Sequence, residues 1–157
     1  MRFEDFTAAR LPALLRYAML LSGHREDARD IVQEVLARAL VKWDRVGSVD
    51  EPYAYVRRMV TNEFLSRRRR RKVTTVSLDQ APELVGNPPE DRDDLRQLLA
   101  GLPRQQRAVL VLRYYEGLTD TEIGEVLGCR VTTVRGYASR ALASLRIELK
   151  TNEGANR

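Results

Sequence analysis

The residues from Gly117 to Leu149 constrain the fold of this chain more than any other stretch, because they encode two helices joined by a tight turn. Thr119 and Glu122 have the spacing of a capping box, which predicts that a helix begins there. Gly128 can adopt the left-handed conformation that ends a helix. A short helix, a turn containing glycine and a longer amphipathic helix form the helix-turn-helix pattern.

The second helix of this motif is predicted to begin near Val131 or Thr132. Its apolar residues recur at three- and four-residue spacing: Val134, Ala138, Ala141, Leu142, Leu145 and Leu149. In a helix-turn-helix, the first residues of the second helix meet base edges in the major groove. Here they are side chains that can donate to phosphates and guanine edges: Arg130, Thr132, Thr133 and Arg135. The pattern favours DNA binding, and an ordinary helical hairpin with solvated arginines is the alternative.

The charge of the chain is distributed unevenly, which favours two domains. The net charge of +5 and the pI of about 9.7 suit a polyanionic partner. Residues 1–72 carry a net charge of +6, residues 73–92 carry −3 and residues 93–150 carry +2. The middle segment has no helical period and contains four turn-forming residues, Pro82, Gly86, Pro88 and Pro89. We therefore expect a domain over 1–72, a flexible linker over 73–92, a second domain over 93–150 and a tail over 151–157.

Several kinds of functional site are missing from the sequence. Cys129 is the only cysteine and His24 the only histidine, so neither an internal disulfide nor a Cys/His zinc site can form within one chain. There is no nucleophilic or hydrolytic constellation and no glycine-rich phosphate loop. No apolar run resembles a secretory signal or approaches the length of a membrane span. We expect a cytoplasmic protein that is not an enzyme and has no cofactor, metal, small-molecule substrate or membrane insertion.

All predicted elements are helical, so the expected fold class is all-α. In the first domain, helices are predicted over Phe3–Leu21, over Arg25–Trp43 and from Pro52 to about Arg70. Pro12 implies that the first helix either has a kink or starts later. A polar loop is predicted between Asp44 and Glu51. The second domain is predicted to contain helices over 90–100 and 103–116 before the helix-turn-helix. The fold expected is therefore two small helical domains joined by a flexible linker.

Two charged surfaces of the first domain have both a functional and a structural interpretation. Asp27, Asp30, Gln33 and Glu34 lie off the apolar stripe of the second helix, as either a solvated face or a docking surface for a basic partner. The run from Arg67 to Lys72 either frays or binds phosphates. Tyr53 and Tyr55 beside cationic residues are typical of single-stranded nucleic-acid binding, although core packing explains Tyr53 equally well.

Two stretches resemble one family. EDARDIVQEVLARALVKW (26–43) resembles the core-binding helix of bacterial sigma factors, and LPRQQRAVLVLRYYEGLTDTEIGEVLGCRVTTVRGYASRAL (102–142) resembles their DNA-binding region four. Their order and the linker between them are similar to the extracytoplasmic-function group, which keeps only regions two and four. The actinobacterial SigE-like subgroup is the most similar. The resemblance covers nearly all of residues 1–150.

The resemblance implies a role for each part of the chain. Residues that would bind the β′ clamp helices of core RNA polymerase are Asp30, Gln33, Glu34 and Arg38. Residues of the first domain that would read and open the −10 element of promoter DNA are Gly47, Ser48, Val49, Asp50, Arg57, Arg58, Asn62, Arg67, Arg68 and Arg69. Region four would contact the β flap and read the −35 element through Arg130, Thr132, Thr133, Arg135 and Ser139. An anti-sigma factor is a further possible partner.

The expected function is promoter-specific initiation of transcription as a sigma factor. A stand-alone helix-turn-helix repressor or activator is the alternative, and it would usually dimerise on half-sites. An adaptor whose basic helix binds RNA or an anionic membrane is a third hypothesis. Binding to core polymerase distinguishes the first hypothesis from the other two.

Overall fold

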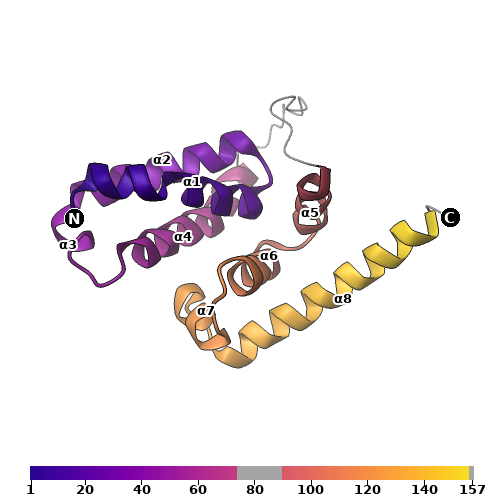
Figure 1. Cartoon of the computed structure of the whole chain (residues 1–157). Coiled ribbons are helices and arrows are strands. Elements are labelled where there is room, and N and C mark those ends of the chain that lie inside the picture. The colour runs from indigo at the N-terminus through magenta and orange to yellow at the C-terminus, as the bar shows by residue number, and fades with distance from the viewer. Residues whose placement is uncertain (74–89, 156–157) are drawn as a thin grey trace.

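The computed structural model describes residues 1–73 and 90–155, with side chains described for residues 1–67 and 95–147. The expected linker between residues 74 and 89, the last two residues of the expected tail, and the side chains of Arg68 and Arg69 therefore lie outside the described residues. The described part of the chain is helical, with helices that form two lobes (Figure 1). The predicted all-α, two-lobe fold is confirmed.

The first lobe consists of three long helices and one short helix. They are α1 (Phe3–Ser22), α2 (Arg25–Val41), α3 (Trp43–Val46) and α4 (Pro52–Val73). The helices α1, α2 and α4 pack against one another around side chains such as Leu14, Ile31 and Phe64, each at most 1% exposed. This core follows from the apolar stripes, because a helix that is apolar on one side gains most of its stability by burying that side.

Two features of the first lobe differ from the sequence-based expectation. The expected polar loop after residue 43 begins with α3, because Val46 is fully buried and Trp43 packs on the ring of Phe6 at 5.1 Å. Pro12 neither ends α1 nor delays its start, and burial of Phe6 and Leu14 on either side offsets the hydrogen bond that proline cannot donate.

The second lobe follows the order α5 (Glu90–Ala100), α6 (Arg104–Leu110), a π-helical turn η1 (Val111–Tyr115), α7 (Asp120–Leu127) and α8 (Val131–Ala155). The π-helical turn was not expected. It widens the helix so that Val111 and Leu112 are both buried, while Tyr114 and Tyr115 are exposed. The amide of Leu118 then donates to the carbonyl of Leu112, and the chain turns into α7.

The helix-turn-helix forms as the local signals predict. The Thr119 hydroxyl accepts from the amide of Glu122, the Glu122 carboxylate accepts from the amide of Thr119, and Gly128 has φ of 69°. The helix α8 begins at Val131 but runs on to Ala155, six residues past Leu149 and into the expected tail. No proline or glycine interrupts the sequence between Tyr137 and Glu153, so nothing local ends the helix earlier.

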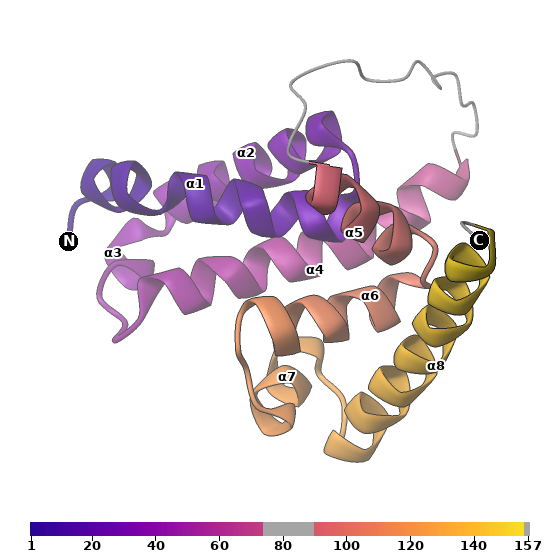
Figure 2. The same ribbon diagram turned by 45° about the vertical axis from the view of Figure 1, so that its right-hand side comes forward.

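The two lobes lie against each other, a contact that the sequence analysis does not predict. Helix α1 packs on α5, α6 and η1, and α4 packs on α6 and α7, as two views of the ribbon agree (Figures 1 and 2). Arg107 of α6 is buried in this contact and donates to the carbonyl oxygens of Leu21, Ala100 and Leu102. Burial lowers the pKa of Arg107 to about 10, and its three acceptors compensate for the water it has lost.

Candidate nucleic-acid interface

The predicted base-reading residues gather at the N-terminal end of α8. Arg130 stands at the turn before the helix, and Thr132, Arg135 and Ser139 are exposed along it, with Thr133 half-buried. Val134, Ala138 and Ala141 form the opposite side, which is buried against α6 and α7. The amphipathic pattern therefore presents one polar side of α8 to solvent at the edge of the molecule (Figure 1).

A carboxylate that the sequence analysis did not single out lies beside this surface. Asp120, the first residue of α7, accepts hydrogen bonds from Nε and Nη2 of Arg113 on Oδ1 and from Nε of Arg135 on Oδ2 at 3.3 Å. The hydrogen bond from Arg113 is the main reason why the pKa of Asp120 lies below its usual range. Arg113 and Asp120 lie on either side of the turn at Gly117, and Arg135 lies on α8, so no continuous helix links the three residues and the sequence pattern did not indicate the contact.

The predicted polymerase-binding residues form a stripe along α2. Asp30, Gln33 and Arg38 are exposed, and Glu34 is half-buried. Arg38 bridges this stripe to α4, because it pairs with Glu34 at 2.9 Å and with Glu63 at 3.1 Å. The structure therefore brings the four predicted residues together on one side of one helix.

Glu63 is a buried carboxylate that the sequence analysis missed. Its side chain is 2% exposed and accepts from Arg38 and from Arg67, the latter at 2.7 Å. Glu63 and Arg67 are four residues apart on α4, a spacing that could have indicated this pair. The pairing ties one member of the basic run, Arg67, to its own lobe, where it also donates to the carbonyl of Asp30.

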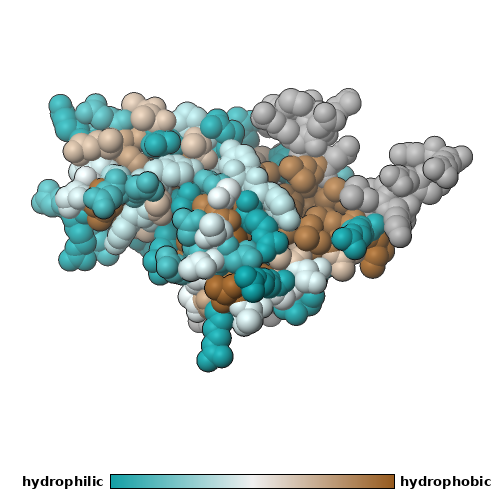
Figure 3. Space-filling view, turned by 60° about the horizontal axis from the view of Figure 1, so that its bottom comes forward, coloured by the Kyte–Doolittle hydropathy of each residue, from teal (hydrophilic) through white to brown (hydrophobic). Residues whose placement is uncertain are grey.

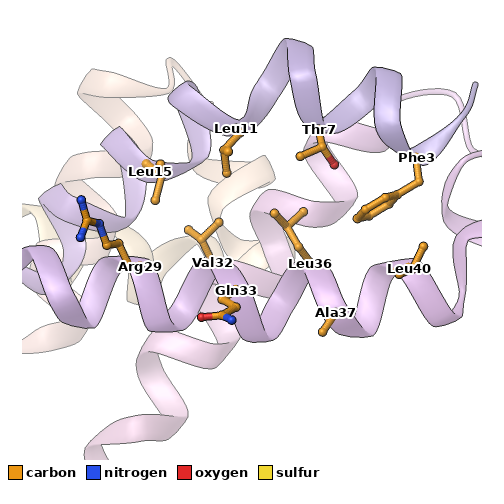
Figure 4. A pocket seen from close by; sticks show the side chains of 10 residues that line it. All are labelled: Phe3, Thr7, Leu11, Leu15, Arg29, Val32, Gln33, Leu36, Ala37 and Leu40. Carbon is orange, nitrogen blue, oxygen red and sulfur yellow. The ribbon is translucent and has the colours of Figure 1, made fainter.

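An apolar groove runs beside the stripe, between α1 and α2. It encloses about 390 Å³, and Figure 4 shows the side chains that line it from both helices: Phe3, Thr7, Leu11, Leu15, Arg29, Val32, Gln33, Leu36, Ala37 and Leu40. Leu40, which the sequence places in the buried stripe of α2, is 53% exposed at one end of the groove. Gln33 belongs to both the groove and the polar stripe.

The predicted −10 residues divide into an exposed and a covered group. In the loop after α3, Ser48 and Asp50 are exposed and Gly47 and Val49 half-buried. On α4, Arg58 and Asn62 are exposed. Arg57, by contrast, has a side chain that is only 13% exposed, because it is covered by the second lobe.

Glu116 is the residue that covers Arg57. Its carboxylate accepts from Nη1 of Arg57 at 3.2 Å and from the hydroxyl of Tyr53 at 3.0 Å. Burial, and after it the Glu116 carboxylate, raises the pKa of Tyr53 above the usual value of a tyrosine, at which the hydroxyl is already a donor at neutral pH. Tyr53 is half-buried, and Arg10 also lies over its ring at 4.9 Å. In this arrangement Tyr53 and Arg57 serve the contact between the lobes.

The wider surface is mixed in character. In the space-filling view that brings the lower side forward, hydrophilic residues predominate on the left and in the centre, and hydrophobic residues gather on the right (Figure 3). Within residues 1–73 and 90–155, no helix is long and apolar enough to span a membrane. The same residues contain no group of three or more His, Cys, Asp or Glu side chains that could hold a metal ion.

Comparison with known proteins covers both lobes. Residues 7–74 match the family model "Sigma-70 region 2", and residues 92–145 match "Sigma-70, region 4". The RNA polymerase sigma-E factor of Streptomyces avermitilis is 35% identical over 98% of this chain and 88% of its own length. The ECF RNA polymerase sigma factor EcfG of Rhodopseudomonas palustris is 31% identical over 90% of this chain and 82% of its own.

A solved structure agrees with this result. The sigma factor RpoE of Bartonella quintana, solved in complex with the anti-sigma factor NepR, superimposes with a TM-score of 0.73 at 27% sequence identity. The match covers 94% of this chain and 96% of the other. The likeness therefore extends over both lobes.

Proposed function

This chain belongs to the extracytoplasmic-function group of RNA polymerase sigma factors, and we propose that it binds core RNA polymerase and directs it to specific promoters. The observation that carries the proposal is the combination of two surfaces in one chain. The second lobe presents a polar helix end of the kind that reads duplex DNA, and the first lobe presents the polar stripe on α2. We assign residues 1–72 to region two, 73–92 to the linker, 93–150 to region four and 151–157 to the tail.

The stripe on α2 is the proposed binding site for the β′ clamp helices. Asp30 and Glu34 give it negative charge on a lobe whose net charge is positive, which suits a basic partner. Arg38 is held by Glu34 and Glu63, so its guanidinium neutralises buried charge as well as facing the partner. Gln33 places an amide between the two acidic residues and the apolar groove.

The loop of residues Gly47 to Asp50 and the exposed side of α4 form the proposed −10 site. Extruding a base from duplex DNA costs a few kcal/mol of stacking and pairing energy. That cost is offset by a loop that captures the extruded base while Arg58 and Asn62 contact the DNA backbone beside it. The arginines from Arg67 to Arg69 would contribute phosphate contacts that do not depend on sequence.

The N-terminal end of α8 is the proposed −35 site. Arg130 and Arg135 can each donate two hydrogen bonds to guanine, and Thr132, Thr133 and Ser139 can donate to phosphates or bases. In this function the polymerase performs the chemistry, so the chain needs no catalytic residue of its own. The protein would act in the cytoplasm, where the polymerase works, and an anti-sigma factor that covers the same surfaces would inhibit it.

The experiment that tests this proposal is binding to purified core polymerase. The chain should co-elute with core polymerase, and the complex should bind promoter DNA more tightly than either component does. A stand-alone regulator would behave differently, since it would bind duplex half-sites as a dimer with no gain from polymerase. That second result would contradict the proposal.

A further inference from the structure

Asp120 connects two arginines that belong to different parts of the second lobe. Arg113 comes from η1, Arg135 comes from α8, and Asp120 stands at the start of α7 between them. Each carboxylate oxygen serves one arginine, since Oδ1 accepts from Arg113 and Oδ2 accepts from Arg135. The three residues therefore join both helices of the helix-turn-helix to the element that precedes them.

The contact with Arg135 uses one particular nitrogen. Asp120 accepts from Nε, the nitrogen nearest the backbone, at 3.3 Å. The two terminal nitrogens, Nη1 and Nη2, lie at the far end of the planar group and point away from Nε. These are the two donors that an arginine uses when it meets guanine O6 and N7 end on. Because Asp120 already occupies Nε, Arg135 can make a bidentate contact with guanine only through Nη1 and Nη2.

The pairing matters because the Arg135 side chain is otherwise unsupported. Its side chain is 68% exposed, and a free arginine side chain loses rotamer entropy when it is held in one geometry. A partner that holds the side chain before DNA arrives lowers the part of this cost that falls on binding. The benefit is largest for a bidentate contact, because that contact depends on orientation as well as on distance.

Arg113 offsets the negative charge that Asp120 would otherwise place next to DNA. An isolated Asp120 near DNA would repel phosphates, but two arginines surround it, so the group of three carries a net positive charge. Arg113 also donates twice to the same oxygen, which fixes the orientation of the carboxylate before Arg135 binds to it. The helix N-terminus and the capping box at Thr119 hold the backbone of Asp120 in place.

We propose that Asp120 is a positioning residue that presents the guanidinium of Arg135 end on to a guanine edge, and so determines promoter specificity more than promoter affinity. This inference rests on the proposed function, because it requires Arg135 to read DNA. The rival interpretation of the same contact is that Asp120 competes with DNA for Arg135. The two interpretations give opposite results when the charge of Asp120 is removed.

The test measures base preference in the −35 element with polymerase bound to the full chain. Asp120→Asn removes the charge, and Glu125→Gln is the matched control, because Glu125 is an exposed carboxylate on the same helix. Arg135→Ala should relax preference at one base pair. Asp120→Asn should reduce discrimination at that same base pair by about fivefold or more, within the range of one bidentate contact, while Glu125→Gln leaves it unchanged.

A double-mutant cycle separates positioning from a general loss of structure. In the Arg135→Ala background, Asp120→Asn should cause no further loss of discrimination, because its effect acts through Arg135. If Asp120→Asn does not fold, Asp120→Glu preserves the charge but moves the carboxylate by one methylene, and the same loss is expected from it.

Three results would overturn the inference. If Arg135→Ala relaxes one base pair and Asp120→Asn behaves like Glu125→Gln, the positioning role is wrong and the proposed function stands. If Asp120→Asn tightens binding to all sequences alike, Asp120 is a competitor of DNA. If Arg135→Ala itself changes no base preference, Arg135 does not read DNA, and both this inference and that part of the proposed function are wrong.

Discussion

Arg57 of the first lobe and Glu116 of the second form an ion pair with an N–O distance of 3.2 Å, and their side chains are 13% and 10% exposed. Arg57 is also one of the residues proposed to contact DNA near the −10 element. Glu116 occupies only Nη1 of Arg57, but the second lobe covers the whole guanidinium. Binding of Arg57 to a phosphate therefore requires the second lobe to move away from it.

The first prediction concerns this pair. Glu116→Gln leaves Arg57 charged and covered, a state that is unfavourable as long as the lobes remain in contact. Because the lobes can separate and return Arg57 to water, we expect a more extended chain, measured as a larger radius of gyration by small-angle X-ray scattering. Glu125→Gln is the control and should leave the radius unchanged. An unchanged radius in Glu116→Gln would show that this pair does not hold the lobes together.

The second prediction concerns the stripe on α2. Glu34→Lys should weaken binding to core polymerase by at least tenfold, because it reverses a charge in the proposed site. The fold should persist, since the Glu34–Arg38 pair is about half exposed and such pairs contribute roughly 0.3–0.5 kcal/mol. Asp44→Lys makes the same charge change on α3 and serves as the control in the binding assay. Equal affinity for both variants would place the polymerase contact elsewhere.

The third prediction concerns a buried hydroxyl that the sequence analysis did not identify. Thr61 donates to the carbonyl of Arg57 at 2.9 Å, so the Tyr17 hydroxyl must be the donor in the 2.6 Å bond between Tyr17 and Thr61. Tyr17→Phe removes that donor and should cost about 1 kcal/mol of unfolding free energy, measured by urea denaturation. Tyr55→Phe alters an exposed tyrosine of α4 and should cost less than about 0.5 kcal/mol. Equal costs would mean that the buried bond contributes nothing.

The fourth prediction concerns acid stability of the helix-turn-helix. The pKa of Asp120 is lowered mainly by its hydrogen bond with Arg113, and that of Glu122 mainly by the amide of Thr119. A carboxyl whose pKa is lower in the folded state stabilises the fold above its unfolded pKa of about 4, and loses that effect as the pH falls through the folded value. Wild type should therefore melt at a higher temperature than the Asp120→Asn, Glu122→Gln double variant at pH 7, and the difference should vanish near pH 2. A constant difference across this range would contradict the assignment.

The elements that could be predicted from sequence are those whose signals are local. Thr119, Glu122 and Gly128 specify the start and end of α7 through contacts within a few residues, and the structure reproduces them. The apolar stripe of α2 likewise predicts which side is buried, apart from Leu40, whose neighbours leave one end of the groove open. Local signals also explain why α8 begins where it was expected to begin.

The features that the sequence did not predict depend on partners far away in the chain. Glu116 meets Tyr53 and Arg57 across about sixty positions, and Arg107 meets the carbonyl of Leu21 across 86. No periodicity connects such residues, so neither the contact between the lobes nor the role of Asp120 between Arg113 and Arg135 could be read from spacing. The π-helical turn belongs to the same group, because the packing of Val111 and Leu112 together determines it.

Transcription from a randomised promoter library shows whether this chain makes core RNA polymerase select promoters. Purified core polymerase with the chain should produce transcripts from a small set of templates that share −35 and −10 sequences at constant spacing. Arg135→Ala should relax one position of the −35 sequence, and core polymerase alone should select nothing. If the chain binds core polymerase but the transcribed templates remain the same as with core polymerase alone, the claim that this chain is a promoter-selecting sigma factor is contradicted.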